Sequence, residues 1–225
     1  GAAHELATPL GTIALVAKEL ERSISKADSV ESSLEDLRLI REQVARCRLI
    51  LDQMSGGLGR SSGQMVEETS LPVLIRDALT GVRSEPAVFV EVDDDSRSTG
   101  LTLPPRAVSQ ALRSVITNAQ DASSGQSRVL VRASVHGERV EIVVIDAGRG
   151  MSHDVLSRVS EPFFTTKAPG RGMGLGLYLT RAVVESLGGS LSFESVEGEG
   201  TSVRVELPRE VDLKQVREYA EVERV

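Results

Sequence analysis

The chain has 225 residues, of which 40% are hydrophobic and 26% charged, as expected for a globular protein with one or two domains. The formal net charge is −7 and no dense run of Lys or Arg is present, which argues against nucleic acid as a partner. The single cysteine excludes an intrachain disulfide and favours a reducing, cytoplasmic compartment.

Two amphipathic helices are expected at the N-terminal end. Between residues 4 and 24, apolar side chains recur at alternating steps of three and four, which places them in a single stripe along a helix. A second stripe runs through residues 34–54 and includes Cys47. Because a hairpin of two such helices covers its own stripes poorly, we expect a homodimer in which two hairpins form a four-helix bundle.

The chain starts at Gly1 inside the first expected helix. We therefore expect a fragment, whose parent protein could carry a sensor or a membrane anchor upstream. Within the fragment, no apolar run approaches the roughly 18 residues of a membrane helix and no signal peptide is visible. We expect the fragment itself to make no contact with a membrane.

A change in composition marks the boundary of the expected hairpin. Residues 55–63, SGGLGRSSG, are rich in Gly and Ser and lack an apolar period, which is typical of a linker. We therefore place the helical hairpin over residues 1–58, a second domain over residues 64–209 and a charged tail over residues 210–225.

The second domain alternates between helical and extended patterns. Helices are expected over residues 71–79, 105–122 and 177–187, and strands over residues 87–92, 101–103, 128–135, 139–145, 190–196 and 201–207. Two pairs of these strands flank short turns that contain Gly, which indicates hairpins. Strands that pair locally, with helices on one face, predict an α+β fold in the form of an α/β sandwich.

A glycine-rich stretch runs from Asp146 to Leu177 in this domain. Asp146 opens it in a Gly-rich turn, and glycines occupy every second position from Gly170 to Gly176, just before an expected helix. Backbone N–H groups in such loops converge on anions, and the helix end adds a positive dipole, so the stretch predicts a phosphate-binding site. The stretch is not a Walker loop, because the pattern G-x-x-x-x-G-K-[ST] does not occur. It does not fit a Rossmann turn either, because the residues before the glycines make a poor strand. A flexible loop without a ligand is the alternative interpretation.

Five sequence blocks occur in a fixed order along the chain. They are His4-Glu5-Leu-Ala-Thr8-Pro9-Leu10, Asn118-Ala-Gln-Asp121-Ala, Asp146-Ala-Gly148-Arg-Gly150, Glu161-Pro-Phe-Phe-Thr-Thr-Lys167 and Gly172-Met-Gly174-Leu-Gly176-Leu177. Over essentially the whole chain, these blocks resemble the H, N, G1, F and G2 boxes of the sensor histidine kinase catalytic core. The phrase HELATPLGTI, with Cys47 in the second helix, is further similar to the redox-responsive RegB/PrrB-type kinases.

The resemblance implies a dimeric phosphoacceptor hairpin, followed by an ATP-binding domain of the fold shared with HSP90, MutL and gyrase. It implies autophosphorylation of His4 from ATP and Mg²⁺, then transfer to an aspartate in the receiver domain of a response regulator. A neutral imidazole is nucleophilic near neutral pH, and the adjacent carboxylate of Glu5 can take its proton. Thr8 lies one helical turn after His4 and resembles the residue that orients a hydrolytic water in the phosphatase reaction on the regulator.

The resemblance also assigns a nucleotide site to the second domain. Asn118 offers a hard amide oxygen for Mg²⁺, and Asp146 would contact the adenine amino group, with space provided by Gly148 and Gly150. Residues 151–171 would form a mobile lid. The lid would carry Phe163, Phe164, Lys167 and Arg171, and the triphosphate path would be lined by Gly172, Gly174, Leu175 and Gly176.

The chain departs from the family pattern at two positions of the N box. Many members have Asn or Glu where this chain has Ser114, and a basic residue where it has Asp121. An acidic side chain beside a triphosphate is unfavourable, so Asp121 either contacts Mg²⁺-bound water or points elsewhere.

Simpler interpretations remain for several site residues. His4, Lys167 and Arg171 could be solvated, Asn118 could cap a helix, and the two Phe residues could belong to the core. Cys47 continues an apolar stripe, which packing alone explains, although Arg46 and Arg48 beside it would favour the thiolate of a redox switch.

A nucleotide-gated module that binds ATP and a regulator without transferring phosphate is the alternative function. It is disfavoured because a degenerate kinase should have lost His4, Asn118 or Asp146, and all three are present.

Overall fold

The computed structural model describes most of the second half of the chain and short stretches of the first. The described residues are 12–13, 15–17, 20, 37, 39–40, 43–44, 65–123, 127–162, 164–167 and 174–211. The chain divides into two compact units, one with residues 1–60 and 166–173, the other with residues 61–165 and 174–225.

In the first unit, the described residues between 12 and 44 are all helical, in agreement with the two apolar stripes. Val16 is buried and Ala17 exposed, so the buried side of the first helix is turned slightly from the predicted stripe. In the second stripe, Leu37 and Val44 are 46% and 40% exposed. The turn of the hairpin lies outside the described residues, and the four-helix bundle remains a prediction.

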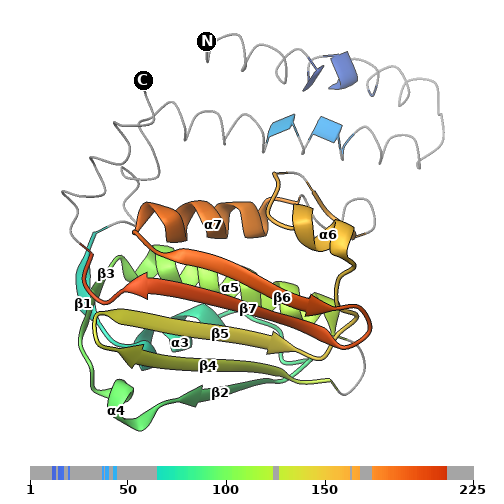
Figure 1. The fold of residues 1–225 in the computed structure, drawn as a ribbon. Coiled ribbons are helices and arrows are strands. Elements are labelled where there is room, and N and C mark those ends of the chain that lie inside the picture. Colours follow the sequence, from blue (N-terminus) through green and yellow to red (C-terminus); the bar gives the residue numbers. More distant parts are fainter. Residues whose placement is uncertain are drawn as a thin grey trace. The chain divides into compact units, whose positions relative to one another are not determined.

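The second unit is built on a five-stranded sheet with the strand order β2-β4-β5-β7-β6 (Figure 1). The strands are β2 (Val88–Val92), β4 (Val129–His136), β5 (Arg139–Asp146), β6 (Ser190–Val196) and β7 (Gly200–Pro208). β2 runs parallel to β4, and the other neighbours are antiparallel. The two predicted hairpins are therefore present as β4–β5 and β6–β7.

A second, two-stranded sheet joins β1 (Glu67–Thr69) to β3 (Leu101–Leu103). The segment after β7 lies beside β3, because the Thr102 amide donates to Arg209 O at 2.9 Å and the Val211 amide donates to Thr102 O at 2.9 Å. A short helix, α4 (Asp94–Arg97), connects β2 to β3.

Three helices pack on one face of the large sheet: α3 (Leu71–Leu79), α5 (Pro105–Ala122) and α7 (Gly176–Ser186). Proline stands in the first turn of α3 and α5, where its missing N–H has no helical partner to lose. α5 is joined to α3 by polar contacts, since the Ser109 hydroxyl donates to Leu74 O at 3.0 Å and the Arg113 guanidinium donates to Asp77 O at 2.7 Å.

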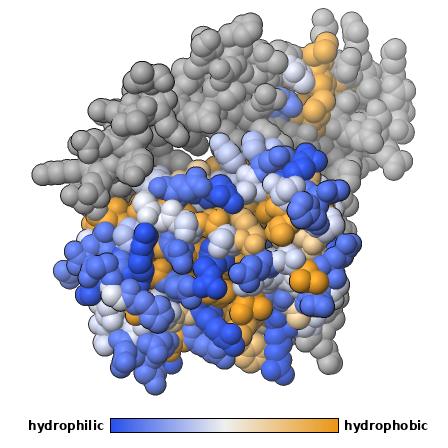
Figure 2. Space-filling view, viewed as in Figure 1, coloured by the Kyte–Doolittle hydropathy of each residue, from blue (hydrophilic) through white to orange (hydrophobic). Residues whose placement is uncertain are grey.

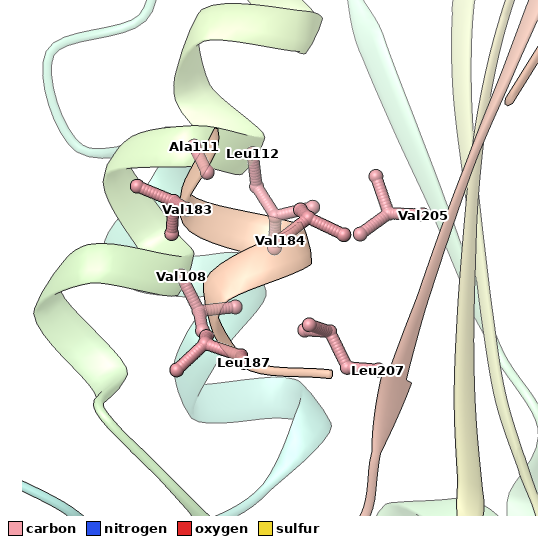
Figure 3. A pocket seen from close by; sticks show the side chains of 8 residues that line it. All are labelled: Val108, Ala111, Leu112, Val183, Val184, Leu187, Val205 and Leu207. Carbon is pink, nitrogen blue, oxygen red and sulfur yellow. The ribbon is translucent and has the colours of Figure 1, made fainter. Parts of the chain in front are cut away.

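The core lies between these helices and the sheet. Figure 3 shows one part of it, where apolar side chains of α5, α7 and β7 converge from three sides. They are Val108, Ala111, Leu112, Val183, Val184, Leu187, Val205 and Leu207. These side chains leave no room for a water molecule between them, so this region is packing and not a ligand site.

The exposed side of the second unit mixes hydrophilic and hydrophobic residues (Figure 2). Ion pairs cross neighbouring strands, between Glu91 and Arg132 and between Glu141 and Arg204. Among the residues that the structure describes, no helix has the length and hydrophobicity needed to cross a membrane.

The predicted helices and strands of the second domain occur within one or two residues of their expected bounds, and the helices lie on one face as expected. Sequence patterns gave no indication of β1, α4 or α6 (His153–Arg158), the last of which lies inside the expected lid. The parallel pairing of β2 with β4 also differs from an arrangement of local hairpins alone, because α5 separates these two strands in the chain.

Candidate functional site

Asp146 is the last residue of β5 and the single buried acidic side chain among the described residues, with 6% exposure. Its Oδ1 accepts a hydrogen bond from the Gly148 amide at 2.9 Å. Burial raises the pKa of the Asp146 carboxyl above its ordinary value, and hydrogen bonds from the backbone of Gly148 and Thr201 oppose that rise. A carboxylate has about four lone-pair sites, so two backbone donors leave acceptor capacity for a ligand.

The loop after Asp146 is fixed between α5 and the β6–β7 turn. The Arg149 amide donates to Ala122 O at 3.2 Å, and the Gly198 amide donates to Arg149 O at 2.8 Å. A Cβ atom at position 148 would lie 2.8 Å from Asp146 Oδ1 and overlap the Ala122 carbonyl. At Gly150, where φ is +62°, a Cβ atom would overlap the Val196 carbonyl oxygen. Both glycines therefore allow backbone contacts that no other residue permits.

The second glycine box meets α5 at the N box. A Cβ atom on Gly176 would lie 2.7 Å from Ser114 Oγ and 3.6 Å from Asn118 Nδ2. Asn118 lies one turn before Ala122 on the same side of α5, so this side of the helix contacts both glycine segments. Gly176 is also the first residue of α7, and no side chain of the described residues caps that end. Its N–H groups and dipole therefore favour an anion.

Asp121 points to the loop between α3 and β2. It forms an ion pair with Arg83, whose backbone carbonyl accepts a hydrogen bond from Gln120 Nε2 at 2.9 Å. The same Nε2 donates to Pro86 O at 2.7 Å. The ion pair with Arg83 accounts for the acidic side chain at this position, and a nucleotide contact by Asp121 stays a prediction.

The expected lid is described from residue 151 to 162 and again from 164 to 167. It contains α6, within which none of the residues is buried. The Arg158 guanidinium lies 4.4 Å from the centroid of the Phe164 ring and its Nε lies 3.0 Å from Glu161 Oε2. Phe164 thus has a cation–π partner instead of a place in the core.

The structure describes ten of the predicted site residues, and Gly174, Leu175 and Lys167 are among them. Leu175 is buried immediately before α7, and Gly174 has a φ of +65°. The other predicted positions lie outside the described residues, and their roles stay predictions. They are His4, Glu5, Thr8, Cys47, Phe163, Arg171 and Gly172.

A magnesium site made of protein side chains alone is not seen among the described residues, which hold no group of three or more His, Cys, Asp or Glu in suitable positions. This is compatible with the predicted cation, because Mg²⁺ is commonly held by one or two protein oxygens and the substrate phosphates. Asn118 provides one such amide oxygen beside the N-terminal end of α7.

Sequence reasoning missed the contribution of the β6–β7 hairpin to this site. Thr201 hydrogen-bonds Asp146 through its backbone, and the Ser195 hydroxyl accepts from the Met151 amide at 2.8 Å. The glycines of the turn, Gly198 and Gly200, are the sequence signal that could have indicated this contact, because a Cβ atom at Gly200 would overlap the Asp146 carbonyl.

Replacing Asp146 by asparagine is expected to weaken ATP binding by roughly 1–3 kcal/mol, because the amide loses charge-assisted hydrogen bonding in a desolvated site. The raised pKa also gives the nucleotide-free protein a pH dependence. Because burial disfavours the ionised carboxyl, the folded state is more stable when Asp146 is protonated. This contribution to the free energy of unfolding is lost as the pH rises through the raised pKa.

Calorimetric titration with ATP measures the first effect, and urea unfolding between about pH 4 and pH 7 measures the second. The stability of Asp146→Asn relative to the wild type should increase with pH in that range. Asp95→Asn, which changes an exposed carboxylate on α4, should alter neither quantity. Unchanged ATP affinity in Asp146→Asn would remove Asp146 from the nucleotide site.

Residues 104–211 match the model of the family described as histidine kinase-, DNA gyrase B-, and HSP90-like ATPase. The chain is 34% identical over 206 residues to the sensor histidine kinase RegB of Cereibacter sphaeroides, covering 85% of this chain and 43% of RegB. It is 29% identical over 226 residues to the sensor histidine kinase ZraS of Escherichia coli K12, covering 95% of this chain and 45% of ZraS. The chain thus spans less than half the length of these relatives.

Solved structures resemble the fold. A mycobacterial sensor histidine kinase, MprB, matches with a TM-score of 0.54 and 25% identity, over 66% of this chain and all of the MprB chain. The histidine kinase ThkA, crystallised in complex with the response regulator protein TrrA, matches with a TM-score of 0.60 and 19% identity, over 92% of this chain and 59% of ThkA. The similarity to RegB expected from the HELATPLGTI phrase is confirmed by the sequence match.

Proposed function

We propose that this chain transfers the γ-phosphoryl group of ATP to His4 and then to an aspartate of a response regulator, because residues 104–211 match the family of histidine kinase-like ATPases and the chain is similar to the sensor histidine kinase RegB. The reaction would involve two parts of the chain, the N-terminal segment with His4, which is predicted to be helical, and the second unit, which would bind the nucleotide. ATP is the substrate, and Mg²⁺ is the cation that would neutralise the phosphate charge when bound.

One observation carries the nucleotide part of the proposal. The buried carboxylate of Asp146 directly precedes a loop in which close backbone packing requires glycines. One side of α5 contacts both this loop and the N-terminal end of α7. The carboxylate suits an amino group such as that of adenine, and the helix end suits phosphate. Asn118 lies between the two and suits the cation that bridges phosphates.

The chemistry of transfer follows from an imidazole nucleophile beside a carboxylate. A ring nitrogen of His4 attacks the γ-phosphorus of ATP, and the bond from that phosphorus to the β,γ-bridging oxygen breaks. ADP leaves with the electron pair, while Glu5 takes the proton from the ring. The phosphorylated ring then serves as the donor for the aspartate of the receiver domain.

The finer features of the function form part of the same proposal. A homodimer would cover the apolar side chains that Leu37 and Val44 expose, and the regulator complex of ThkA supports a receiver domain as partner. A phosphatase reaction would depend on Thr8, and a redox response on Cys47, whose packing role is the simpler alternative.

The test is transfer from the phosphorylated chain to a receiver domain. The chain is labelled with γ-labelled ATP, freed of nucleotide and mixed with a receiver domain or with the same domain carrying Asn at the acceptor aspartate. The label should move to the former and stay on the chain with the latter. ATP binding without any labelling would support the nucleotide-gated module and contradict the kinase.

Replacing Thr8 by alanine is expected to separate the two activities. The hydroxyl can position a water for dephosphorylation of the regulator but is not needed when imidazole attacks ATP, so autophosphorylation should stay within about twofold of the wild type. Dephosphorylation should slow at least tenfold, the usual scale for a lost positioning group. Parallel rate measurements on one preparation check this result. An equal loss of both rates would mean that Thr8 has a structural role near Pro9.

A further inference from the structure

A polar row crosses the end of the large sheet on its helix-facing side. Strand register pairs Asp146 of β5 with Thr201 of β7, and Thr201 with Ser195 of β6. Residues in register on neighbouring strands point to the same face, so these three side chains form one row. The next row on that face, Val144, Val203 and Phe193, is apolar. The polar row therefore lies at the point where the core ends and the Asp146 loop begins.

The Ser195 hydroxyl lies in three hydrogen bonds. It donates to Gly200 O at 3.0 Å, accepts from the Met151 amide at 2.8 Å and lies 2.9 Å from Thr201 Oγ1. Because its single hydrogen goes to Gly200, the Thr201 hydroxyl must be the donor in the third bond. One donor and two acceptors are thereby used, so the hydroxyl holds β7 and Met151 in a fixed relation.

Two of the three hydrogen-bond partners of Ser195, Thr201 and Met151, connect it to the candidate site. Thr201 hydrogen-bonds the Asp146 carboxyl through its backbone. Met151 is the first residue of the expected lid and directly follows Gly150, which packs against the Val196 carbonyl next to Ser195. The Ser195 hydroxyl therefore bonds directly to Met151, at one end of the segment from Asp146 to Met151. It is connected to the other end through Thr201.

We propose that Ser195 is a positioning residue for the nucleotide site, which sets the position of Asp146 and fixes Met151, the first residue of the expected lid. It touches neither nucleotide nor phosphate in this proposal and acts through Thr201 and Met151. The inference deepens the proposed function and rests on it for the nucleotide, whereas its account of the loop concerns the protein alone.

The contact with Met151 has a second consequence. The loop is anchored to α5 through Arg149 and Ala122, and to the β6–β7 hairpin through Met151, Arg149 and Gly198. Loss of the Ser195 hydroxyl removes the last hairpin contact before α6 and leaves the others in place. The fold should persist, while the Met151 amide opens to solvent more often.

The experiment compares Ser195→Ala with Ser192→Ala in the full chain. Ser192 lies on the same strand but is exposed and points to the opposite face. Ser192→Ala therefore removes the same hydroxyl group at a position outside the polar row. Hydrogen exchange at the Met151 amide is measured without nucleotide, and ATP affinity is measured by calorimetry. Ser195→Thr, which keeps the hydroxyl, is the rescue variant.

In Ser195→Ala, Met151 should exchange about tenfold faster and ATP affinity should fall roughly five- to tenfold, the scale of one net hydrogen bond. Ser192→Ala should match the wild type, and Ser195→Thr should recover most of both losses. Unchanged exchange and affinity in Ser195→Ala would overturn the inference. An affinity loss with unchanged exchange would also overturn it, because the loop would not be the route.

Two further outcomes keep the result interpretable. Should Ser195→Ala fail to fold, Thr201→Val removes one of the three hydrogen bonds with little change of volume, and it should show a smaller change in the same direction. A wild-type chain that does not bind ATP would contradict the proposed function, and the exchange measurement alone would then decide the role of Ser195.

Discussion

Replacing His4 by alanine is expected to abolish incorporation of phosphate from ATP, a loss of at least a thousandfold, while ATP affinity changes less than twofold. The imidazole is the nucleophile in the proposed reaction, and its removal leaves no group that can accept the phosphoryl group. Asn118, Asp146, Gly148 and Gly176, which are proposed to bind ATP, lie in the second unit, beyond the predicted linker of residues 55–63. Loss of the acceptor should therefore leave the nucleotide site unchanged.

Phosphate incorporation and ATP affinity are measured on the same preparation to separate the two effects. His136→Ala is the matched control, because His136 is exposed at the end of β4, contacts Ser134 and belongs to none of the five boxes. It should incorporate label as the wild type does. Full incorporation of acid-labile phosphate in His4→Ala would show that another residue is the acceptor.

Replacing Gly150 by alanine is expected to destabilise the second unit by about 3 kcal/mol and to remove measurable ATP binding at micromolar concentrations. Two costs combine at this position. An alanine at a φ of +62° is strained by about 1 kcal/mol, and its Cβ atom would overlap the Val196 carbonyl, which belongs to backbone that cannot move aside freely. The loop must then leave the β6–β7 hairpin.

Gly137→Ala separates these two costs. Gly137 lies in the β4–β5 turn with a φ of +60°, and nothing lies within 4 Å of a Cβ atom placed there. It should lose only about 1 kcal/mol, measured by urea unfolding, and should bind ATP normally. Equal losses in the two variants would mean that the contact with Val196 does not constrain the loop.

The sequence predicted the long elements of the second unit because each has a local signal. The helix over residues 105–122 begins at Pro104-Pro105 and buries Val108, Leu112 and Ala119 at helical spacing, and its predicted bounds match the structure. The hairpins have glycine turns at residues 137 and 198. Patterns of this kind depend on residues close together in the chain, which a single sequence reveals.

The missed elements lack such signals. β1 has three residues and exists because Glu67 pairs with Leu103, and α6 has no buried residue to produce an apolar period. The direction of the Asp121 side chain also has no local signal, because its partner Arg83 lies 38 residues away in the chain. Interactions between distant segments set the direction of such a side chain, and one sequence does not disclose them.

The residues of the candidate site also differ in whether the sequence predicts them. Asn118, Asp146 and the glycines were found because they stand in recognisable blocks, and the structure brings Asn118 to Gly176 and Gly148 to Ala122. Ser195 and Thr201 have no such signal in the sequence, since a polar residue at the end of a strand is common. Their place in the site follows from strand register across β5, β7 and β6.

The central claim, that the chain is an ATP-dependent histidine kinase, is tested most directly by the chemical stability of the phosphate that it incorporates. The chain is incubated with γ-labelled ATP and Mg²⁺, and the label is then exposed to acid and to base. A phosphoryl group on nitrogen of His4 predicts label that is lost in acid and retained in base, with a stoichiometry that approaches one phosphate per chain. Label that survives acid, or no label under conditions where ATP is bound, would contradict the account.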